Sequence, residues 1–216
     1  MADNLIEAQY DITKKTKLKK FFEKNKIFIY LFIFVLVVFF VSFGLYLESK
    51  GKKKVLISES YLQAKIYLGN NKKAEALDIL KTIILTNDQP YSALSFFMIL
   101  DQSLIKDQNE VISLFNHLLE NNKFDKEIKN LLIYKKALYS SNYLDETELL
   151  TELKPLLNKK EILWKGHALL LLGNYFVSKK EYMKAKDFYN QVLSTNNLQK
   201  NLYDQAKLQL ELIANK

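Results

Sequence analysis

Apolar and polar positions follow two different patterns along this chain. From Ile27 to Leu47 the sequence is apolar and carries no charge for 21 residues (IFIYLFIFVLVVFFVSFGLYL). After residue 54, apolar residues recur every three or four positions, which is the spacing of a helix with one buried face. The pattern therefore predicts an all-α protein, in which an apolar helix is followed by a domain of amphipathic helices without strands.

The apolar run has the length of a membrane span. At about 1.5 Å per residue it extends roughly 31 Å, close to the ~30 Å hydrocarbon core of a bilayer. Tyr30 and Tyr46 lie near its ends, where aromatic rings prefer the headgroup level. A core helix of a soluble protein would have a polar face, and a cleaved signal peptide would be shorter, with small residues where Phe43, Tyr46 and Leu47 stand. We predict an uncleaved signal anchor that crosses a lipid bilayer once.

Lysines flank the predicted span on both sides. Seven precede it and four follow it: Lys14, Lys15, Lys17, Lys19, Lys20, Lys24 and Lys26, then Lys50, Lys52, Lys53 and Lys54. The excess before the span predicts a cytoplasmic N-terminus and a C-terminal part on the other side of the membrane. The predicted divisions are a lysine-rich cytoplasmic segment 1–26, a transmembrane helix 27–47, a basic linker 48–54 and a helical domain 55–216.

Turn-forming residues interrupt the apolar pattern of the helical domain about every 16 to 20 residues. The breaks are Gly69-Asn70-Asn71, Asn87-Asp88-Gln89-Pro90, Lys106-Asp107-Gln108, Asn121-Asn122, Ser140-Ser141-Asn142, Asn158-Lys159-Lys160, Ser178-Lys179-Lys180 and Asn196-Asn197. They predict eight helices in four hairpins, followed by a last helix from about Asn201 to Ala214. That helix would cap the domain with its apolar residues turned inward: Leu202, Ala206, Leu208 and Leu212.

Single residues support these boundaries. Asp145 followed by Glu148 has the form of a capping box at a helix start, and Pro90 suits the first turn of a helix. Pro155 interrupts the second helix of the third hairpin, where we expect a kink or an early end.

Small residues recur at matching places in the first and last hairpins. Gly173 and Ala185 are twelve positions apart in LLGNYFVSKKEYMKAKDFYNQVL, and Ala64 and Ala76 have the same separation in YLQAKIYLGNNKKAEALDILKTI. This resembles a tetratricopeptide repeat, in which small residues let the two helices of a hairpin approach closely. In the middle hairpins Val111 and Leu149 take the place of the second small residue, which makes the spacings 35, 38 and 36 against the family's period of 34.

Composition and charge narrow the possible functions. All 32 basic residues are lysine, and residues 55–216 carry 21 of them against 19 acidic residues, a net charge of only +2. A nearly neutral domain without arginine does not favour nucleic-acid binding. The absence of cysteine excludes disulfides, thiolate metal sites and a cysteine nucleophile.

Residues that could carry chemistry are sparse. The two histidines, His117 and His167, lie outside any metal-binding motif, and no nucleotide-binding or nucleophile-elbow motif is present. The acidic residues Glu146, Glu148 and Glu152 are typical of a solvated helix surface. We therefore expect no enzymatic activity, no cofactor, no metal and no small-molecule substrate.

A stack of α-hairpins has a concave side lined by the first helix of each hairpin. The candidate groove positions are Tyr61, Lys65, Phe96, Leu100, Tyr134, Leu138, His167, Leu170 and Asn174. An aromatic residue recurs in three of the four hairpins, which would suit an extended or helical peptide with apolar side chains. Because the chain holds 13 Tyr and 14 Phe, ordinary packing explains this recurrence equally well.

The order of a lysine-rich N-terminus, one span, four tetratricopeptide-like hairpins and a terminal helix resembles the YfgM-like family of ancillary bacterial Sec translocon subunits. The segment from Gly51-Lys52-Lys53 to Tyr61-Leu62-Gln63-Ala64 also looks like that family's first repeat. The composition, rich in Lys, Asn and Ile, would fit an AT-rich genome such as that of an α-proteobacterium. The resemblance implies a bacterial inner-membrane protein with a periplasmic repeat domain that contacts the translocon and periplasmic chaperones.

Two functions follow as hypotheses. The first is a membrane-anchored interaction module that assists protein export through its groove. The second is a structural scaffold or assembly subunit of an envelope complex, recruited through its transmembrane helix.

Overall fold

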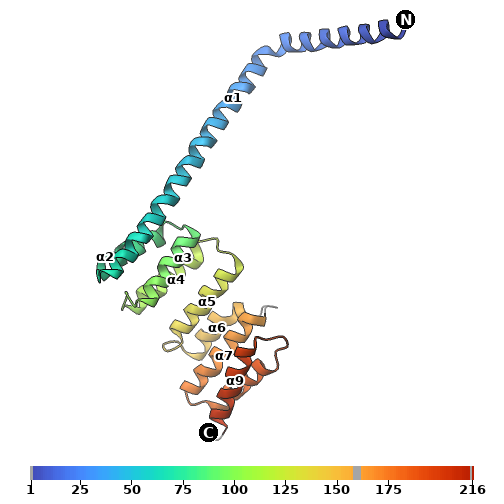
Figure 1. The fold of residues 1–216 in the computed structure, drawn as a ribbon. Helices are drawn as coiled ribbons and strands as arrows, with labels where there is room; N and C mark the ends of the chain where they lie inside the picture. Colours follow the sequence, from blue (N-terminus) through green and yellow to red (C-terminus); the bar gives the residue numbers. More distant parts are fainter. Residues whose placement is uncertain (1, 158–161, 215) are drawn as a thin grey trace. The chain divides into compact units, whose positions relative to one another are not determined.

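A computed structural model describes residues 2–157, 162–214 and 216 of the chain. These ranges contain nine α-helices and no strand, which confirms the all-α prediction. The helices are α1 (Ala2–Gly69), α2 (Lys73–Leu85), α3 (Gln89–Asp101), α4 (Gln108–Asn121), α5 (Lys126–Ser140), α6 (Glu146–Leu157), α7 (Ile162–Ser178), α8 (Tyr182–Leu193) and α9 (Lys200–Ile213) (Figure 1). The chain divides into two compact units, residues 1–59 and 60–216.

The first unit consists of the N-terminal part of α1. Residues 27–47 form continuous helix, and the most apolar stretch of the helix has no buried residue. Phe28 and Phe40, for example, are 75% and 66% exposed. A core helix of a soluble protein would be covered by other parts of its chain, whereas this stretch is exposed along its length. The described part of the chain thus has one helix that is long and apolar enough to cross a membrane.

In the second unit, the connections fall at the breaks that the sequence predicts, and the break at Asn158-Lys159-Lys160 lies outside the described residues. Asn71 and Asn87 adopt positive φ angles of 59° and 56° two residues after a helix ends, and Asn197 (58°) lies in the connection between α8 and α9. Asparagine tolerates this left-handed conformation better than most residues, which explains its recurrence at these breaks. Pro155 lies inside α6, which continues to Leu157.

Acidic caps start several helices. The amide of Asp145 donates to Glu148 Oε2 (3.0 Å), and the amide of Glu148 donates to Asp145 Oδ1 (2.8 Å), so the predicted capping box is present. Asp88 and Asp125 accept hydrogen bonds from amides in the first turns of α3 and α5, and Pro90 occupies the first turn of α3. These local bonds satisfy helix-end groups that would otherwise lack partners.

The turns of the first and last hairpins have the same geometry. Asn71 and Lys180 have φ angles of 59° and 62° at equivalent places in the two turns. In each turn the next residue's amide donates to the carbonyl five residues earlier, Lys72 to Tyr67 (2.8 Å) and Glu181 to Phe176 (2.9 Å). The small residues singled out in the sequence, Ala64, Ala76, Gly173 and Ala185, are all buried.

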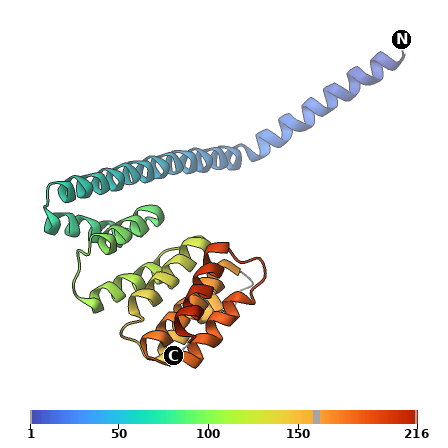
Figure 2. The ribbon, with the colours of Figure 1, turned by 60° about the horizontal axis from the view of Figure 1, so that its bottom comes forward.

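The second unit has two hydrophobic cores. The first joins the end of α1 to α2, α3, α4 and α5, with Phe96 and Phe115 in edge-to-face contact (4.4 Å between ring centroids). The second joins α5 to α6, α7, α8 and α9, which lie side by side in Figures 1 and 2. Helix α5 belongs to both cores, because it contributes Leu132 to the first and Ala137 to the second.

The last helix corrects one prediction. Leu202 and Ala206 of α9 are buried as expected, but Leu208 and Leu212 are 54% and 60% exposed. The buried stripe instead continues to Ile213, which is 2% exposed. At about 100° per residue, Leu202, Ala206 and Ile213 share one face, whereas Leu208 and Leu212 project from another face of the helix.

Candidate functional site

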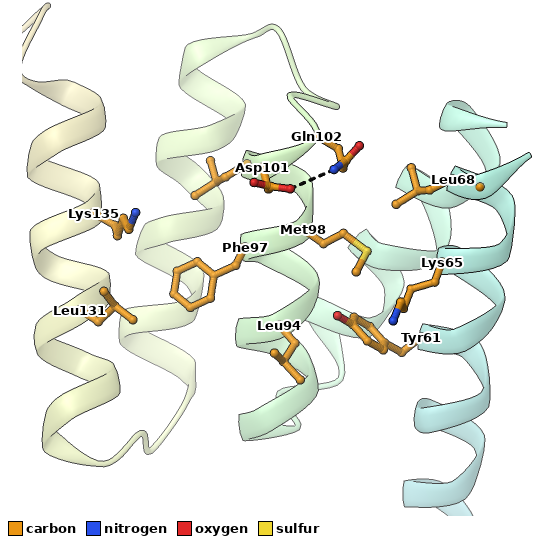
Figure 3. A pocket seen from close by; sticks show the side chains of 12 residues that line it. Tyr61, Lys65, Leu68, Leu94, Phe97, Met98, Asp101, Gln102, Leu131 and Lys135 are labelled. Carbon is orange, nitrogen blue, oxygen red and sulfur yellow. Dashed lines mark hydrogen bonds between the residues drawn. The ribbon is translucent and has the colours of Figure 1, made fainter. Parts of the chain in front are cut away.

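A groove of about 860 Å³ lies over three helices of the second unit (Figure 3). Its lining comes from the end of α1, from α3 and from α5. The lining residues are Tyr61, Lys65, Leu68, Gly69, Leu94, Phe97, Met98, Leu100, Asp101, Gln102, Leu131 and Lys135. These helices are the first members of the first three hairpins, the class of helix that the sequence places on the concave side.

Helical periodicity explains which side chains reach the groove. On α3, Leu94, Phe97 and Met98 are spaced by three and four residues and so share one face. The same helix buries Phe96 and Ile99, which are at most 1% exposed, on its opposite side. The floor of the groove is therefore the outer face of a helix whose inner face is held by the first hydrophobic core.

Two further contacts hold α3 in place. The ring of Tyr91 packs on the ring of Tyr61 at the end of α1 (5.6 Å between centroids). The buried hydroxyl of Ser92 lies 3.2 Å from the carbonyl oxygens of both Ile83 and Ile84 at the end of α2. Desolvation by burial, and secondly the nearby Tyr91 phenol, raise the pKa of Tyr61, so it remains a neutral phenol at physiological pH.

The side chains of the groove combine an apolar floor with charges. Leu68, Phe97, Met98 and Leu131 are half-buried, and Leu94 is 46% exposed. Lys65 and Lys135 stand on α1 and α5, on either side of α3 (Figure 3). The carboxylate of Asp101 accepts a hydrogen bond from Gln102 Nε2 (2.9 Å). This arrangement can hold apolar groups on its floor and anionic groups at two lysines.

Three of the predicted groove residues line this groove, namely Tyr61, Lys65 and Leu100. Phe96 does not, because it is fully buried against Phe115. Consecutive residues of a helix project about 100° apart, so the neighbouring Phe97 reaches the groove in its place. On α5 the lining residues are Leu131 and Lys135 rather than Tyr134 and Leu138.

The other predicted residues lie elsewhere. Tyr134 packs against Trp164 and His167 of α7, with ring centroids 5.3–6.2 Å apart, and Leu138 is 40% exposed. Leu170 is only 7% exposed in the second core, so it cannot line an open surface. Asn174 is exposed, and its Oδ1 accepts a hydrogen bond from the Tyr189 hydroxyl (2.7 Å).

The ring cluster of Tyr134, Trp164 and His167 joins α5 to α7. Trp164 Nε1 donates a hydrogen bond to Glu127 Oε2 (2.7 Å) at the start of α5. Burial raises the pKa of Tyr134 and lowers the pKa of His167, so both rings are neutral at physiological pH. These rings in mutual contact form a packed joint between the two helices, separate from the groove.

The lining residues that the sequence did not single out are Leu68, Gly69, Leu94, Phe97, Met98, Asp101, Gln102, Leu131 and Lys135. On α3, helical periodicity places Leu94 and Met98 on the same face as Phe97, so the sequence would have indicated them if Phe97 rather than Phe96 had been taken as the outward residue. Within the described residues, no group of three or more His, Cys, Asp or Glu side chains could hold a metal ion.

Comparison of the chain with models of protein families, with curated proteins and with solved structures finds no match.

Proposed function

We propose that this chain is a membrane-anchored protein–protein interaction module that binds a polypeptide segment of another protein. The observation that carries this proposal is the groove over α1, α3 and α5, with its apolar floor. Its lining extends over three helices, which suits a polypeptide segment better than a compact small molecule. Peptide grooves on helical surfaces gain affinity from such apolar contacts.

The second unit is, in this proposal, a tetratricopeptide-like solenoid with α9 as its terminal cap. Support comes from the equivalent turns at Asn71 and Lys180 and from the four buried small residues of the first and last hairpins. In the C-terminal half of the unit, contacts of α5 with α7, and of α7 with α9, also join first helices of successive hairpins with each other and with the terminal helix, as in a stack of hairpins.

The proposed location is the bacterial inner membrane, with the N-terminus in the cytoplasm and the helical domain in the periplasm. The exposed apolar run 27–47 and the lysine excess before it support this arrangement. The resemblance to the YfgM-like family suggests the translocon or periplasmic chaperones as partners. Protease added to intact spheroplasts should remove the helical domain, whereas protection of that domain would contradict the topology.

Photocrosslinking from inside the groove tests the proposed function. A benzoyl-phenylalanine placed at Leu94 or Phe97 of the membrane-embedded full chain should form adducts with a polypeptide. The matched control is Met183, which is 74% exposed on α8 and does not line the groove. Equal adduct yields from all three positions, or none from the two groove positions, would contradict groove binding.

The exposed apolar helix also supports a second candidate, a scaffold subunit that is recruited to an envelope complex through its span. Replacing residues 27–47 with an unrelated apolar helix of equal length separates the two functions. Loss of partner association would favour the scaffold, and retained association would favour the groove.

A further inference from the structure

The charges of the groove point to the chemistry of its occupant. Lys65 and Lys135 are exposed, and neither ammonium group forms an ion pair with any residue that the structure describes. The single carboxylate of the lining, Asp101, is already hydrogen-bonded to the Gln102 amide. The lining therefore has a net charge of +1 and two cations that remain available to an anionic partner.

Three other lysines of the same unit, Lys81, Lys136 and Lys184, form ion pairs with described residues. Lys136, the neighbour of Lys135 on α5, pairs with Glu152 of α6 (2.9 Å), and Lys184 of α8 pairs with Glu146 (2.6 Å) and Glu181 (2.9 Å). These pairs join helices of the second core or a helix to its preceding turn. The two groove lysines instead flank an apolar floor, so an incoming carboxylate can pair with a lysine while neighbouring apolar side chains cover the floor.

We propose, building on the proposed function, that the groove selects polypeptide segments in which carboxylate side chains flank large apolar side chains. The apolar side chains lie on Leu94, Phe97 and Met98, and the carboxylates pair with Lys65 and Lys135. Lysine-rich segments are rejected because Lys65 and Lys135 repel them and the only carboxylate of the lining, Asp101, is hydrogen-bonded to Gln102.

Two synthetic probes test this selectivity. The first is a fluorescein-labelled peptide of about 12 residues, ~40 Å when extended, in which glutamates flank leucine and phenylalanine. The second carries lysine at every glutamate position. Each is titrated with the full chain in phosphatidylcholine nanodiscs, with empty nanodiscs subtracted, and fluorescence anisotropy gives the Kd.

We expect the acidic peptide to bind at least ~10-fold more tightly than the lysine peptide at low salt, and this preference to shrink at high salt. The double variant Lys65→Glu with Lys135→Glu should reverse the preference, roughly 10-fold in the other direction. Tighter binding of the lysine peptide by this variant also shows that it is folded. The matched control, Lys129→Glu with Lys207→Glu, changes two exposed lysines outside the groove and should leave both affinities unchanged.

The possible failures are distinguishable. One outcome overturns this inference alone: both peptides bind equally, the charge reversal changes neither affinity, and Phe97→Ala weakens both. In that case the groove binds peptides without selecting their charge. If neither peptide binds the chain above the empty nanodiscs, the proposed function is overturned together with it. If the control variant reverses the preference as strongly as the groove variant, the selectivity comes from the overall charge and the inference is also overturned.

Discussion

Gly173 offers the sharpest test of how the second unit is packed. It lies on α7 against α8, where a Cβ at this position would come within 2.6 Å of Cδ1 and 2.8 Å of Cζ of Tyr189. Tyr189 is fully buried, and its hydroxyl is hydrogen-bonded to Asn174 (2.7 Å). The substitution Gly173→Ala therefore places a methyl group against the buried Tyr189 ring, so that the ring or α8 must shift.

The expected loss can be worked out from these contacts. Alanine gains about 1 kcal/mol over glycine in helix propensity. Against this, overpacking costs about 1–3 kcal/mol, and losing the Tyr189 hydrogen bond costs about 0.5–1.5 kcal/mol. The net destabilisation is about 2 kcal/mol, which corresponds to a Tm lower by about 4–8 °C for a unit of this size.

Thermal unfolding of the full chain in detergent micelles provides the assay, followed by circular dichroism at 222 nm and by the fluorescence of Trp164, the chain's single tryptophan. The matched control is Gly69→Ala, because a Cβ at Gly69 meets nothing within 4 Å. The control should leave the Tm unchanged or raise it slightly. The double variant Gly173→Ala with Tyr189→Leu replaces the ring by a smaller side chain. Its loss of unfolding free energy should be less than the sum of the losses of the two single variants. Equal midpoints for Gly173→Ala and the Gly69→Ala control would refute the close approach of α7 and α8.

Three further predictions concern the capping box, the ring cluster and the span. Asp145→Ala removes the cap that binds the Glu148 amide and should lower the free energy of unfolding by about 1 kcal/mol, while the exposed Asp204→Ala should not. Burial lowers the pKa of His167, so its contribution to stability is complete above the unfolded-state value of 6.5 and is lost as the pH falls through the folded-state pKa. The Tm followed by Trp164 fluorescence should therefore fall between pH 7.5 and 5.5, and His167→Gln should flatten that step; an unchanged slope would contradict this role. At the centre of the span, Val37→Asp adds an insertion cost of about 3 kcal/mol and should increase the fraction of chain released by alkaline carbonate, while Val37→Leu should not.

Helix boundaries were the part of the fold most accessible from sequence. Asn71 and Asn87 mark helix ends because their side chains tolerate positive φ, and Asp145 with Glu148 marks a start through hydrogen bonds three residues apart. Each of these features depends only on residues that are a few positions apart in the sequence. The apolar run 27–47 can also be recognised from neighbouring residues alone, because a charge-free stretch of that length forms a helix without a polar face.

The groove was predictable only in part. The sequence placed it on the first helix of each hairpin and found Tyr61, Lys65 and Leu100. The sequence pattern placed Phe96 in the groove, because either of the two adjacent phenylalanines, Phe96 or Phe97, fits the helical spacing of the outward face. Only the contact of Phe96 with Phe115 on α4 decides which of the two rings is buried.

Sequence by itself indicated where the described connections between helices fall, that Gly173 is a small residue where two helices meet, and that residues 27–47 are apolar on every side of their helix. The tertiary structure alone decided which helices and side chains pack against one another. It divided the second unit into two cores that share α5, and it set Tyr134 against Trp164 and His167 rather than in the groove. It also turned Leu208 and Leu212 of α9 to the surface. The physical reason is that periodicity records how much of a helix is buried, whereas the choice of neighbour depends on contacts between residues tens of positions apart.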